Sequence, residues 1–195
     1  MWLEIFEFLS TVIAVVCCSA AVKLADDYLD QDYDAVVGKP NWARILEQGT
    51  MLYAMFLLAL AAGINASLSL SLFFASYIIG MFGSMYERFP SRLTGFQESL
   101  LACIAGIILF GWSNMLFAVS FVLAVQLFDD YIDARSDQLA GQRNLANRFG
   151  RMECIIICLA CIMIAWRVND YLFLPVFTGT AIIYLLSFRY ERVRI

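Results

Sequence analysis

Residues 26–34 read DDYLDQDYD, and residues 129–137 repeat the pattern as DDYIDARSD. Each copy follows directly on a long apolar run, and every aspartate of the chain except Asp170 lies in one of the two copies. A charged side chain at the centre of a bilayer costs roughly 2.5–3.5 kcal/mol even on the lenient insertion scale. Two groups of carboxylates at the ends of apolar helices therefore predict a compensating ligand, and divalent cations are the natural candidate.

The composition predicts an integral membrane protein. Of the 195 residues, 62% are hydrophobic, whereas a soluble domain has roughly 45–50% apolar residues. A spanning helix needs about 20 mostly apolar residues, and the sequence predicts seven spans, near 5–25, 48–63, 66–86, 97–112, 114–128, 153–167 and 171–189. The turns between them leave almost no chain for a soluble part. We therefore expect an all-α fold, a polytopic transmembrane helical bundle that forms a single domain over residues 1–195.

The basic residues predict the orientation in the cell membrane. If the amino terminus lies outside, every lysine and arginine except Arg167 falls on the cytoplasmic side, as the positive-inside rule requires. The chain start lacks the positively charged region of a signal peptide, so the first apolar run is expected to be a true span. This multi-pass topology places both aspartate motifs and the carboxyl terminus in the cytoplasm.

The chain also predicts an internal duplication. The two motifs begin at Asp26 and Asp129, 103 residues apart, and the tripeptide Tyr-Glu-Arg occurs at 86–88 and again at 190–192. Pseudo-repeats of approximately 5–92 and 109–195 would have the same orientation, related by an axis along the membrane normal as in some transporters. The two motifs should then face each other across a central cavity, near its cytoplasmic mouth.

Other features of the composition exclude several functions. The formal net charge of −4 argues against nucleic acid as a partner, and the absence of histidine excludes histidine bases, haem ligation through histidine and most catalytic zinc sites. All six cysteines fall within predicted spans. Cys154, Cys158 and Cys161 share one helix face and could hold a soft metal, but buried free cysteine mostly behaves as a small hydrophobic residue.

The spacing of the aspartates favours Mg²⁺ and a diphosphate. In a helical motif Asp26, Asp30 and Asp34 lie on one side with Asp27 beside them, and the second copy repeats this face. Carboxylates so placed repel one another unless a cation bridges them. Mg²⁺ prefers oxygen ligands and commonly binds through one or two carboxylates plus substrate phosphates. A lipid tail on such a diphosphate would extend into the apolar cavity behind.

Three simpler interpretations compete with this one. A solvated acidic loop is the usual explanation of a run of charges, but it does not require the same spacing twice. A calcium-binding loop from Asp30 fails because Ala35 stands where glycine is needed and Asn41 where glutamate is needed. An ion pathway is a further possibility, since carboxylates inside membranes often mark one, but the acidic residues of the predicted spans, Glu7, Glu98 and Glu153, all lie at span ends.

At these residues the chain resembles the UbiA superfamily of intramembrane prenyltransferases. The family's first motif, N/D-D-x-x-D-x-x-x-D, is matched by residues 26–34, and its second, D-x-x-D-x-x-x-D, by residues 130–137. Residues 141–150, GQRNLANRFG, look like the family's G-K-R-T-L-A-x-R-x-G segment, and Gly38-Lys39-Pro40 resembles its Asn-Lys-Pro. The resemblance implies a short member of about seven helices around a lipid-open cavity. It implies transfer of a prenyl group from a polyprenyl diphosphate to a lipophilic acceptor, foremost an aromatic one, with Mg²⁺ as cofactor.

The motifs suggest a role for each site residue. We expect the metal ligands to be Asp26, Asp27, Asp30, Asp34, Asp130, Asp133 and Asp137. Basic side chains would contact phosphate oxygens, the candidates being Lys39, Arg44, Arg88, Arg92 and Arg143. The catalytic group would comprise Asp27, Asp30, Asp130 and Asp133 with Tyr28 and Tyr131. Aromatic faces stabilise cations, so the two tyrosines could flank an allylic carbocation, although tyrosine is also common at membrane interfaces.

The chain departs from the family in ways that leave alternatives open. Family members are longer and have more spans, and Trp42-Ala43 stands where the family has Arg-Pro. Either a second subunit, from a homo-oligomer or a different partner, completes the cavity, or the activity has drifted. A membrane terpene cyclase would use the same motifs. A non-catalytic subunit that binds prenyl diphosphate and, more distantly, a cation carrier are further alternatives.

Overall fold

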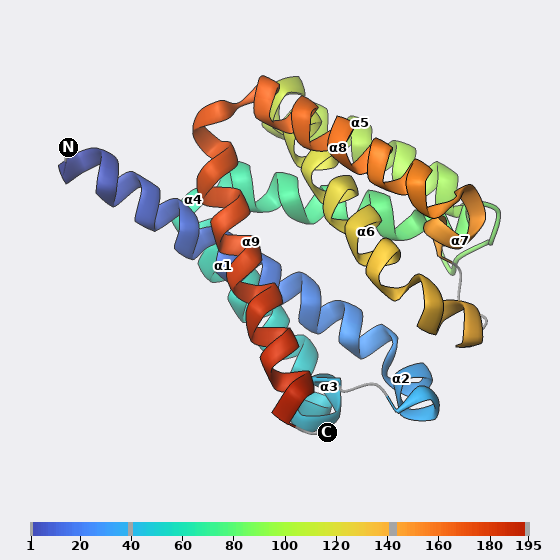
Figure 1. Ribbon diagram of the computed structural model, residues 1–195. Helices are drawn as coiled ribbons and strands as arrows, with labels where there is room; N and C mark the ends of the chain where they lie inside the picture. The colour runs from blue at the N-terminus through green and yellow to red at the C-terminus, as the bar shows by residue number, and fades with distance from the viewer. Residues whose placement is uncertain (1, 39–40, 141–143, 194–195) are drawn as a thin grey trace. The chain divides into compact units, whose positions relative to one another are not determined.

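The computed structural model describes residues 2–38, 41–140 and 144–193. These residues form helices joined by short turns (Figure 1), and they contain no strand beyond an isolated bridge between Arg88 and Thr94. The predicted all-α fold is confirmed. The helices are α1 Trp2–Leu29, α2 Gln31–Val37, α3 Ala43–Leu46, η1 Glu47–Gly49, α4 Thr50–Gly80, η2 Met81–Ser84, α5 Gly95–Phe110, α6 Trp112–Ala140, α7 Leu145–Phe149, α8 Arg151–Val168 and α9 Asp170–Val193.

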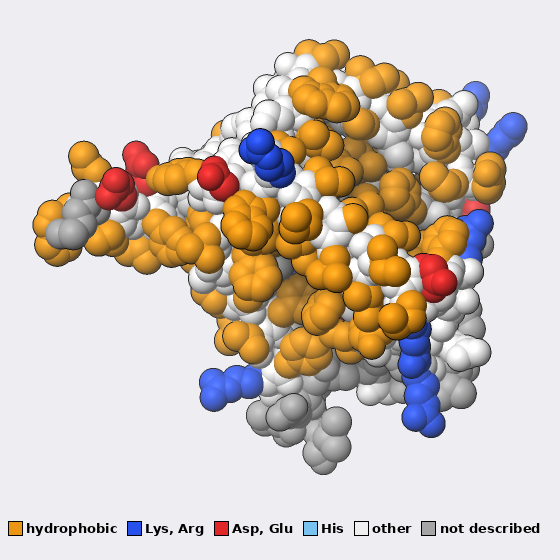
Figure 2. All heavy atoms as spheres, turned by 45° about the horizontal axis from the view of Figure 1, so that its top comes forward, with side chains coloured by type: hydrophobic (Ala, Val, Ile, Leu, Met, Phe, Trp, Pro, Cys, Tyr) orange, Lys and Arg blue, Asp and Glu red, His pale blue; other side chains and the backbone are white. Residues whose placement is uncertain are grey.

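Each of the seven predicted spans falls on a helix, because backbone polar groups inside a bilayer must be satisfied within the segment itself. Four helical stretches of the described residues are long and apolar enough to cross a membrane, namely Trp2–Leu29, Ala43–Ser84, Trp112–Arg135 and Asp170–Arg189. The predicted spans 97–112 and 153–167 fall in α5 and α8, outside those four. Apolar side chains cover most of the face seen in Figure 2, as expected of a protein surrounded by lipid.

The predicted second and third spans share helix α4, which breaks at Asn65. Asn65 has non-helical backbone angles (φ −146°, ψ 88°), and its side chain accepts a hydrogen bond from the Leu68 N–H at 3.1 Å. The Ser69 hydroxyl donates to the carbonyl of Ala61 at 3.0 Å. Residues eight apart cannot meet in a continuous helix, which rises about 1.5 Å per residue, so the chain changes direction at Asn65.

The chain divides into two compact units, Met1–Ser69 with Tyr171–Ile195, and Leu70–Asp170. In the first unit α1 and α9 pack closely at Gly179, where an added Cβ would lie 2.8 Å from the side chain of Val15. The Tyr171 hydroxyl also donates to the Glu7 carboxylate at 2.8 Å. Glycine is therefore required for this helix contact, since the buried branched side chain of Val15 has nowhere to move.

In the second unit, helices α6 and α8 lie side by side (Figure 1). Their core contains Cys154, Cys158 and Cys161 packed with Ala124 and Leu127. The Cys158 thiol donates to the Ala124 carbonyl at 3.3 Å. These cysteines thus lie within a hydrophobic core, and no group of metal-binding side chains forms around them among the described residues.

Candidate functional site

The first aspartate motif continues helix α1 past its apolar part. Helix α1 ends at Leu29, Asp30 interrupts it (φ −95°, ψ 4°), and α2 begins at Gln31. The helical hydrogen-bond spacing nevertheless persists, because the Asp30 N–H donates to the Asp26 carbonyl at 3.0 Å and the Asp34 N–H to the Asp30 carbonyl at 2.8 Å. The second motif lies in α6, which is unbroken to Ala140. Both motifs are therefore helical, as their spacing predicts.

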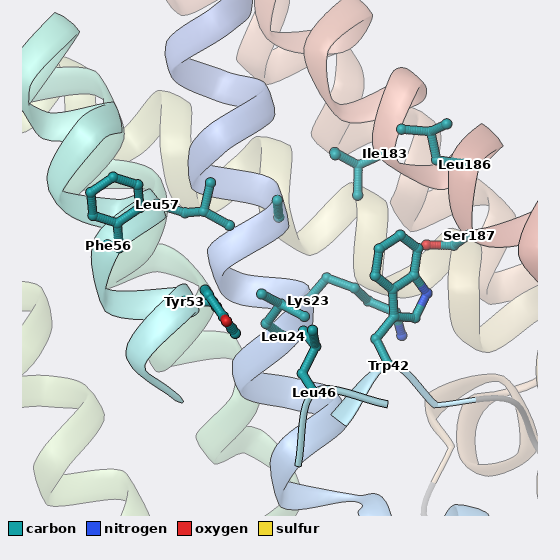
Figure 3. A pocket seen from close by; sticks show the side chains of 11 residues that line it. Lys23, Leu24, Trp42, Leu46, Tyr53, Phe56, Leu57, Ile183, Leu186 and Ser187 are labelled. Atoms are coloured by element: carbon teal, nitrogen blue, oxygen red, sulfur yellow. The ribbon is translucent and has the colours of Figure 1, made fainter. Parts of the chain in front are cut away.

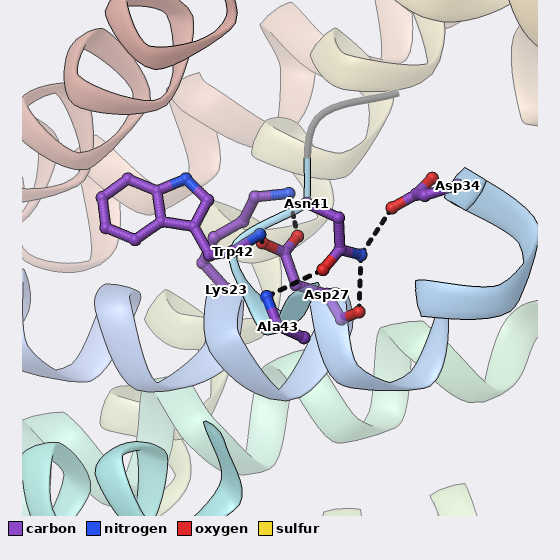
Figure 4. Close-up of polar contacts among 6 residues, drawn as sticks. All are labelled: Lys23, Asp27, Asp34, Asn41, Trp42 and Ala43. Carbon is purple, nitrogen blue, oxygen red and sulfur yellow. Dashed lines mark hydrogen bonds and ion pairs between the residues drawn. The ribbon is translucent and has the colours of Figure 1, made fainter. Parts of the chain in front are cut away.

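A buried asparagine ties the first motif to the loop that follows it (Figure 4). The Asn41 Nδ2 donates to the main-chain oxygen of Asp27 at 2.6 Å and to Oδ2 of Asp34 at 2.7 Å, and its Oδ1 accepts from the Ala43 N–H at 2.8 Å. The Trp42 N–H donates to Oδ2 of Asp27 at 2.9 Å, and the Lys23 Nζ lies 2.9 Å from Oδ1 of Asp27. We call this set of contacts the first clamp.

The second motif is held by the same contacts, each 103 residues further along the chain. The Asn144 Nδ2 donates to the Asp130 main-chain oxygen at 2.8 Å and to Oδ2 of Asp137 at 2.9 Å, and its Oδ1 accepts from the Ala146 N–H at 2.8 Å. The Leu145 N–H donates to Oδ2 of Asp130 at 2.9 Å. The Gln126 Nε2 donates to Oδ1 of Asp130 at 3.0 Å. We call this set the second clamp.

The predicted metal ligands differ in how far the clamps bury their carboxylates. Asp27 and Asp130 are 3% and 8% exposed, and Asp137 is 7% exposed, so these carboxylates form the interior of their clamps. Asp34 and Asp133 are half-buried. Asp26 and Asp30 are exposed. The outward carboxylates are thus available to a ligand in solution, while the inward ones fix the loop.

The donor chemistry of the motifs fits Mg²⁺, because both consist of hard carboxylate oxygens. Within the part of the chain that the structure describes, no three acidic, cysteine or histidine side chains gather into a complete metal site. Mg²⁺ does not require such a cage, since it usually retains waters and takes one or two carboxylates together with substrate phosphates. In the first motif Asp26 and Asp30 are exposed, and in the second Asp133 is half-buried, so their oxygens are open to such contacts.

The predicted phosphate-binding residues occupy different positions. Arg44 is exposed in α3, directly after Ala43 of the first clamp. Arg88 and Arg92 are exposed in the turn between η2 and α5, where the Arg92 N–H donates to the Phe89 carbonyl at 2.8 Å. Arg92 has a φ of 67° there. Lys39 and Arg143 lie outside the described residues.

The two predicted catalytic tyrosines occupy equivalent, partly exposed positions. Tyr28 is 40% exposed and Tyr131 is 37% exposed. Each follows the aspartate whose carboxylate lies in a clamp, so its backbone is fixed by the same hydrogen bonds. Such exposure suits either of the predicted roles, beside a reacting carbon or at the membrane interface.

An apolar pocket lies in the first unit, next to the first clamp (Figure 3). It has a volume of about 320 Å³ and is lined by side chains of α1, α3, the first half of α4 and α9. Phe56 and Leu57 lie on one side, and Trp42 with Ile183 and Leu186 on the other. Lys23 also lines the pocket. Two clamp residues, Lys23 and Trp42, therefore connect the pocket wall to Asp27.

Comparison with known protein families matches residues 2–194 to the UbiA prenyltransferase family. The chain belongs to this family. No curated protein and no solved structure matches it. The UbiA match covers both motifs and both clamps, which confirms the resemblance inferred from the motifs. Members of the family are intramembrane prenyltransferases that generally use Mg²⁺ through their aspartate motifs.

The motif analysis of this UbiA chain missed the two asparagines that complete the clamps. Asn41 and Asn144 lie 14 residues after Asp27 and Asp130, in loops that their composition does not distinguish. A signal was nevertheless present. When the two copies are compared beyond the aspartates, the pattern Asn-x-Ala recurs at 41–43 and 144–146 with the same separation of 103 residues.

Proposed function

We propose that this chain transfers the prenyl group of a polyprenyl diphosphate to a lipophilic acceptor within the membrane, with Mg²⁺ at its aspartate motifs. The observation that carries the proposal is the duplicated clamp, in which equivalent residues hold both motifs by equivalent hydrogen bonds. A solvated acidic loop would not need buried aspartates or the same asparagine contacts in both copies. Membership of the UbiA family supports the reaction type.

The motifs would bind the diphosphate end of the substrate. Asp26, Asp30 and Asp133 would hold Mg²⁺, whose chemistry when bound is to neutralise the diphosphate as a leaving group. Arg44, Arg88 and Arg92 are exposed and would donate charge-assisted hydrogen bonds to phosphate oxygens. Lys39 and Arg143, outside the described residues, are proposed for the same role. The bond between the first prenyl carbon and the diphosphate oxygen breaks, and the diphosphate leaves with the electron pair.

The apolar pocket would receive hydrocarbon next to that end. Its wall is mostly leucine, isoleucine and aromatic side chains, and an apolar wall around the substrate would limit the access of water, which quenches an allylic carbocation. The acceptor then forms a bond to the first prenyl carbon and releases a proton. An aromatic acceptor fits because its ring is both lipophilic and nucleophilic. Tyr28 and Tyr131 would stabilise the cation through their ring faces.

The duplication also supports an organisation for the whole chain. We propose pseudo-repeats of approximately 5–92 and 109–195 in one transmembrane domain, with both motifs and the carboxyl terminus in the cytoplasm. The matching clamps support the duplication.

Diphosphate release by the detergent-purified protein tests this function. Geranyl, farnesyl and geranylgeranyl diphosphate would each be supplied with and without Mg²⁺ and a mixture of lipophilic aromatic acceptors. We expect Mg²⁺-dependent release that falls at least a hundredfold in Asp30→Asn and Asp133→Asn. Asp32→Asn is the matched control, because Asp32 is exposed in the same segment but lies off the repeated positions.

The products separate the remaining alternatives. A prenylated acceptor supports the proposal, whereas a cyclic hydrocarbon formed without any acceptor indicates a terpene cyclase. Mg²⁺-dependent binding of the diphosphate with no release would replace the proposal with a binding subunit. If the protein neither binds nor releases the diphosphate, the assignment of the aspartates is contradicted.

A further inference from the structure

Asn41 and Asn144 have the same three contacts, and both are buried, at 1% and 6% exposure. We infer that they are positioning residues, which fix the backbone of each motif and so hold its outward carboxylates in the arrangement that a cation needs before the cation binds. The inference rests on the proposed function and extends it to residues that do not themselves touch the substrate. It concerns two asparagines that no motif identified.

The short side-chain amide of asparagine suits this set of contacts. Its amide nitrogen has two N–H donors and its oxygen is an acceptor. In each clamp one donor binds the main-chain oxygen of the second aspartate, the other binds a carboxylate oxygen of the last aspartate, and the acceptor binds a backbone N–H. Serine and threonine are too short to reach both aspartates, and aspartate has no donor. The occurrence of asparagine at both positions thus follows from the geometry.

The clamps oppose the repulsion between the carboxylates. Each clamp brings two carboxyl groups to one asparagine, Asp27 with Asp34 and Asp130 with Asp137, and like charges placed close together repel. Each asparagine donates to one carboxylate while fixing the backbone of the other. The motif is therefore ordered before a cation binds, so none of the binding free energy of the cation is used to order it.

This arrangement makes a specific prediction about cation dependence. Without the clamp the cation must order the carboxylates itself, so a higher Mg²⁺ concentration is needed. A hydrogen bond to a charged group contributes roughly 1.5–3 kcal/mol, so loss of one implies an increase of about tenfold or more in the required Mg²⁺. At saturating Mg²⁺ the rate should return close to that of the natural protein.

Asn41→Ser and Asn144→Ser test the inference, because serine keeps an oxygen that can accept from the nearby backbone N–H but does not reach the aspartates. Hydrogen exchange of residues 41–46 and 144–149 would be followed as Mg²⁺ is titrated in the presence of farnesyl diphosphate, with diphosphate release measured in parallel. Asn65→Ser is the matched control, since Asn65 also accepts from a backbone N–H but contacts no aspartate. Asn41→Asp is a second variant that retains the shape and the acceptor.

The expected result is faster exchange without Mg²⁺ only in the loop that carries the substitution. Mg²⁺ should restore the protection of that loop in the variant, and the Mg²⁺ concentration for half-maximal diphosphate release should rise about tenfold, with the control unchanged. Unchanged exchange, or faster exchange with an unchanged Mg²⁺ requirement, would overturn the positioning role. If both loops of the natural protein are protected without Mg²⁺ but no diphosphate is released, the transfer reaction fails while the inference stands. If these loops of the natural protein become protected only when Mg²⁺ binds, the inference fails, whatever the release assay shows.

Discussion

Lys23 and Gln126 occupy the same place in the two clamps, one helical turn before the aspartate whose Oδ1 each contacts. The first is a cation and the second is neutral, so the two clamps differ by one charge at this position; elsewhere in the motifs, Arg135 stands where the first copy has Asp32. Lys23 is 43% exposed, and an ion pair at that exposure contributes about 1 kcal/mol or less to stability. Its main effect should therefore be on the local electrostatic field, where it offsets part of the negative charge of the first motif.

Exchanging these residues between the clamps tests that effect. Lys23→Gln should lower the Mg²⁺ concentration for half-maximal diphosphate release several-fold, because it makes the first motif more negative. Gln126→Lys should raise it, because it adds a cation beside Asp130. Both measurements would be made at one ionic strength, since salt screens such fields. A shift in the same direction for both variants would contradict the electrostatic explanation.

Trp42 combines two roles, which a single substitution can separate. Its main-chain N–H belongs to the first clamp, while its side chain lines the apolar pocket. Trp42→Leu retains the N–H and introduces the residue that the second clamp has as Leu145. We expect an unchanged Mg²⁺ requirement and a several-fold shift toward longer prenyl diphosphates, because the pocket becomes larger. Rates for the three diphosphates measure this preference, and an unchanged preference would show that the pocket does not hold the prenyl chain.

The sequence identified the aspartates but not their partners, for a physical reason. Nine acidic side chains in two spaced groups cannot be explained by membrane packing, so they stand out from composition alone. A single asparagine in a polar loop has many ordinary explanations. Its role depends on the loop folding back over the motif, a contact between residues 14 apart that no helical periodicity predicts.

At the level of helices, asparagine also marks the points where apolar segments change direction. Asn65 has φ −146° and ψ 88°, and Asn169, 104 residues later, has φ −152° and ψ 89°. Hydropathy located the long helices, because each long apolar run must satisfy its own backbone, but it did not indicate the short helices α2, α3 and α7. It placed the helix ends less well, since α1 and α6 continue into the charged motifs, where the clamps rather than hydropathy stabilise the last turns.

Asn65→Ala should destabilise the protein by about 1 kcal/mol, because it removes the side chain that caps the second half of α4. Urea titration in mild detergent, followed by tryptophan fluorescence, would measure the change. Gly63→Ala is the control, since a Cβ at Gly63 meets nothing within 4 Å. Equal stability of Asn65→Ala and the natural protein would show that apolar packing alone sets the turn.

For the molecule as a whole, the prediction of orientation rests on the basic residues, and labelling of single cysteines checks it. Gly63→Cys should react with a membrane-impermeant maleimide added outside intact cells, whereas Ser91→Cys should react only after the membrane is opened. Both positions are exposed, and the natural protein supplies the background from its six cysteines. The reverse pattern would place the motifs outside. Composition predicted a membrane protein because a chain with this apolar content is stable in lipid rather than in water. Composition does not determine the angles at which the helices pack against one another.

The clamps join residues only 14 or 15 apart, which has a consequence for synthesis. Contacts close in sequence form early, and chains emerge from the ribosome at roughly 5–20 residues per second. The first clamp can therefore close several seconds before the second motif has been made. Each half would thus enter the membrane with its charged end already folded. Assembly of the protein would then consist of joining two preformed ends, rather than gathering nine separate carboxylates.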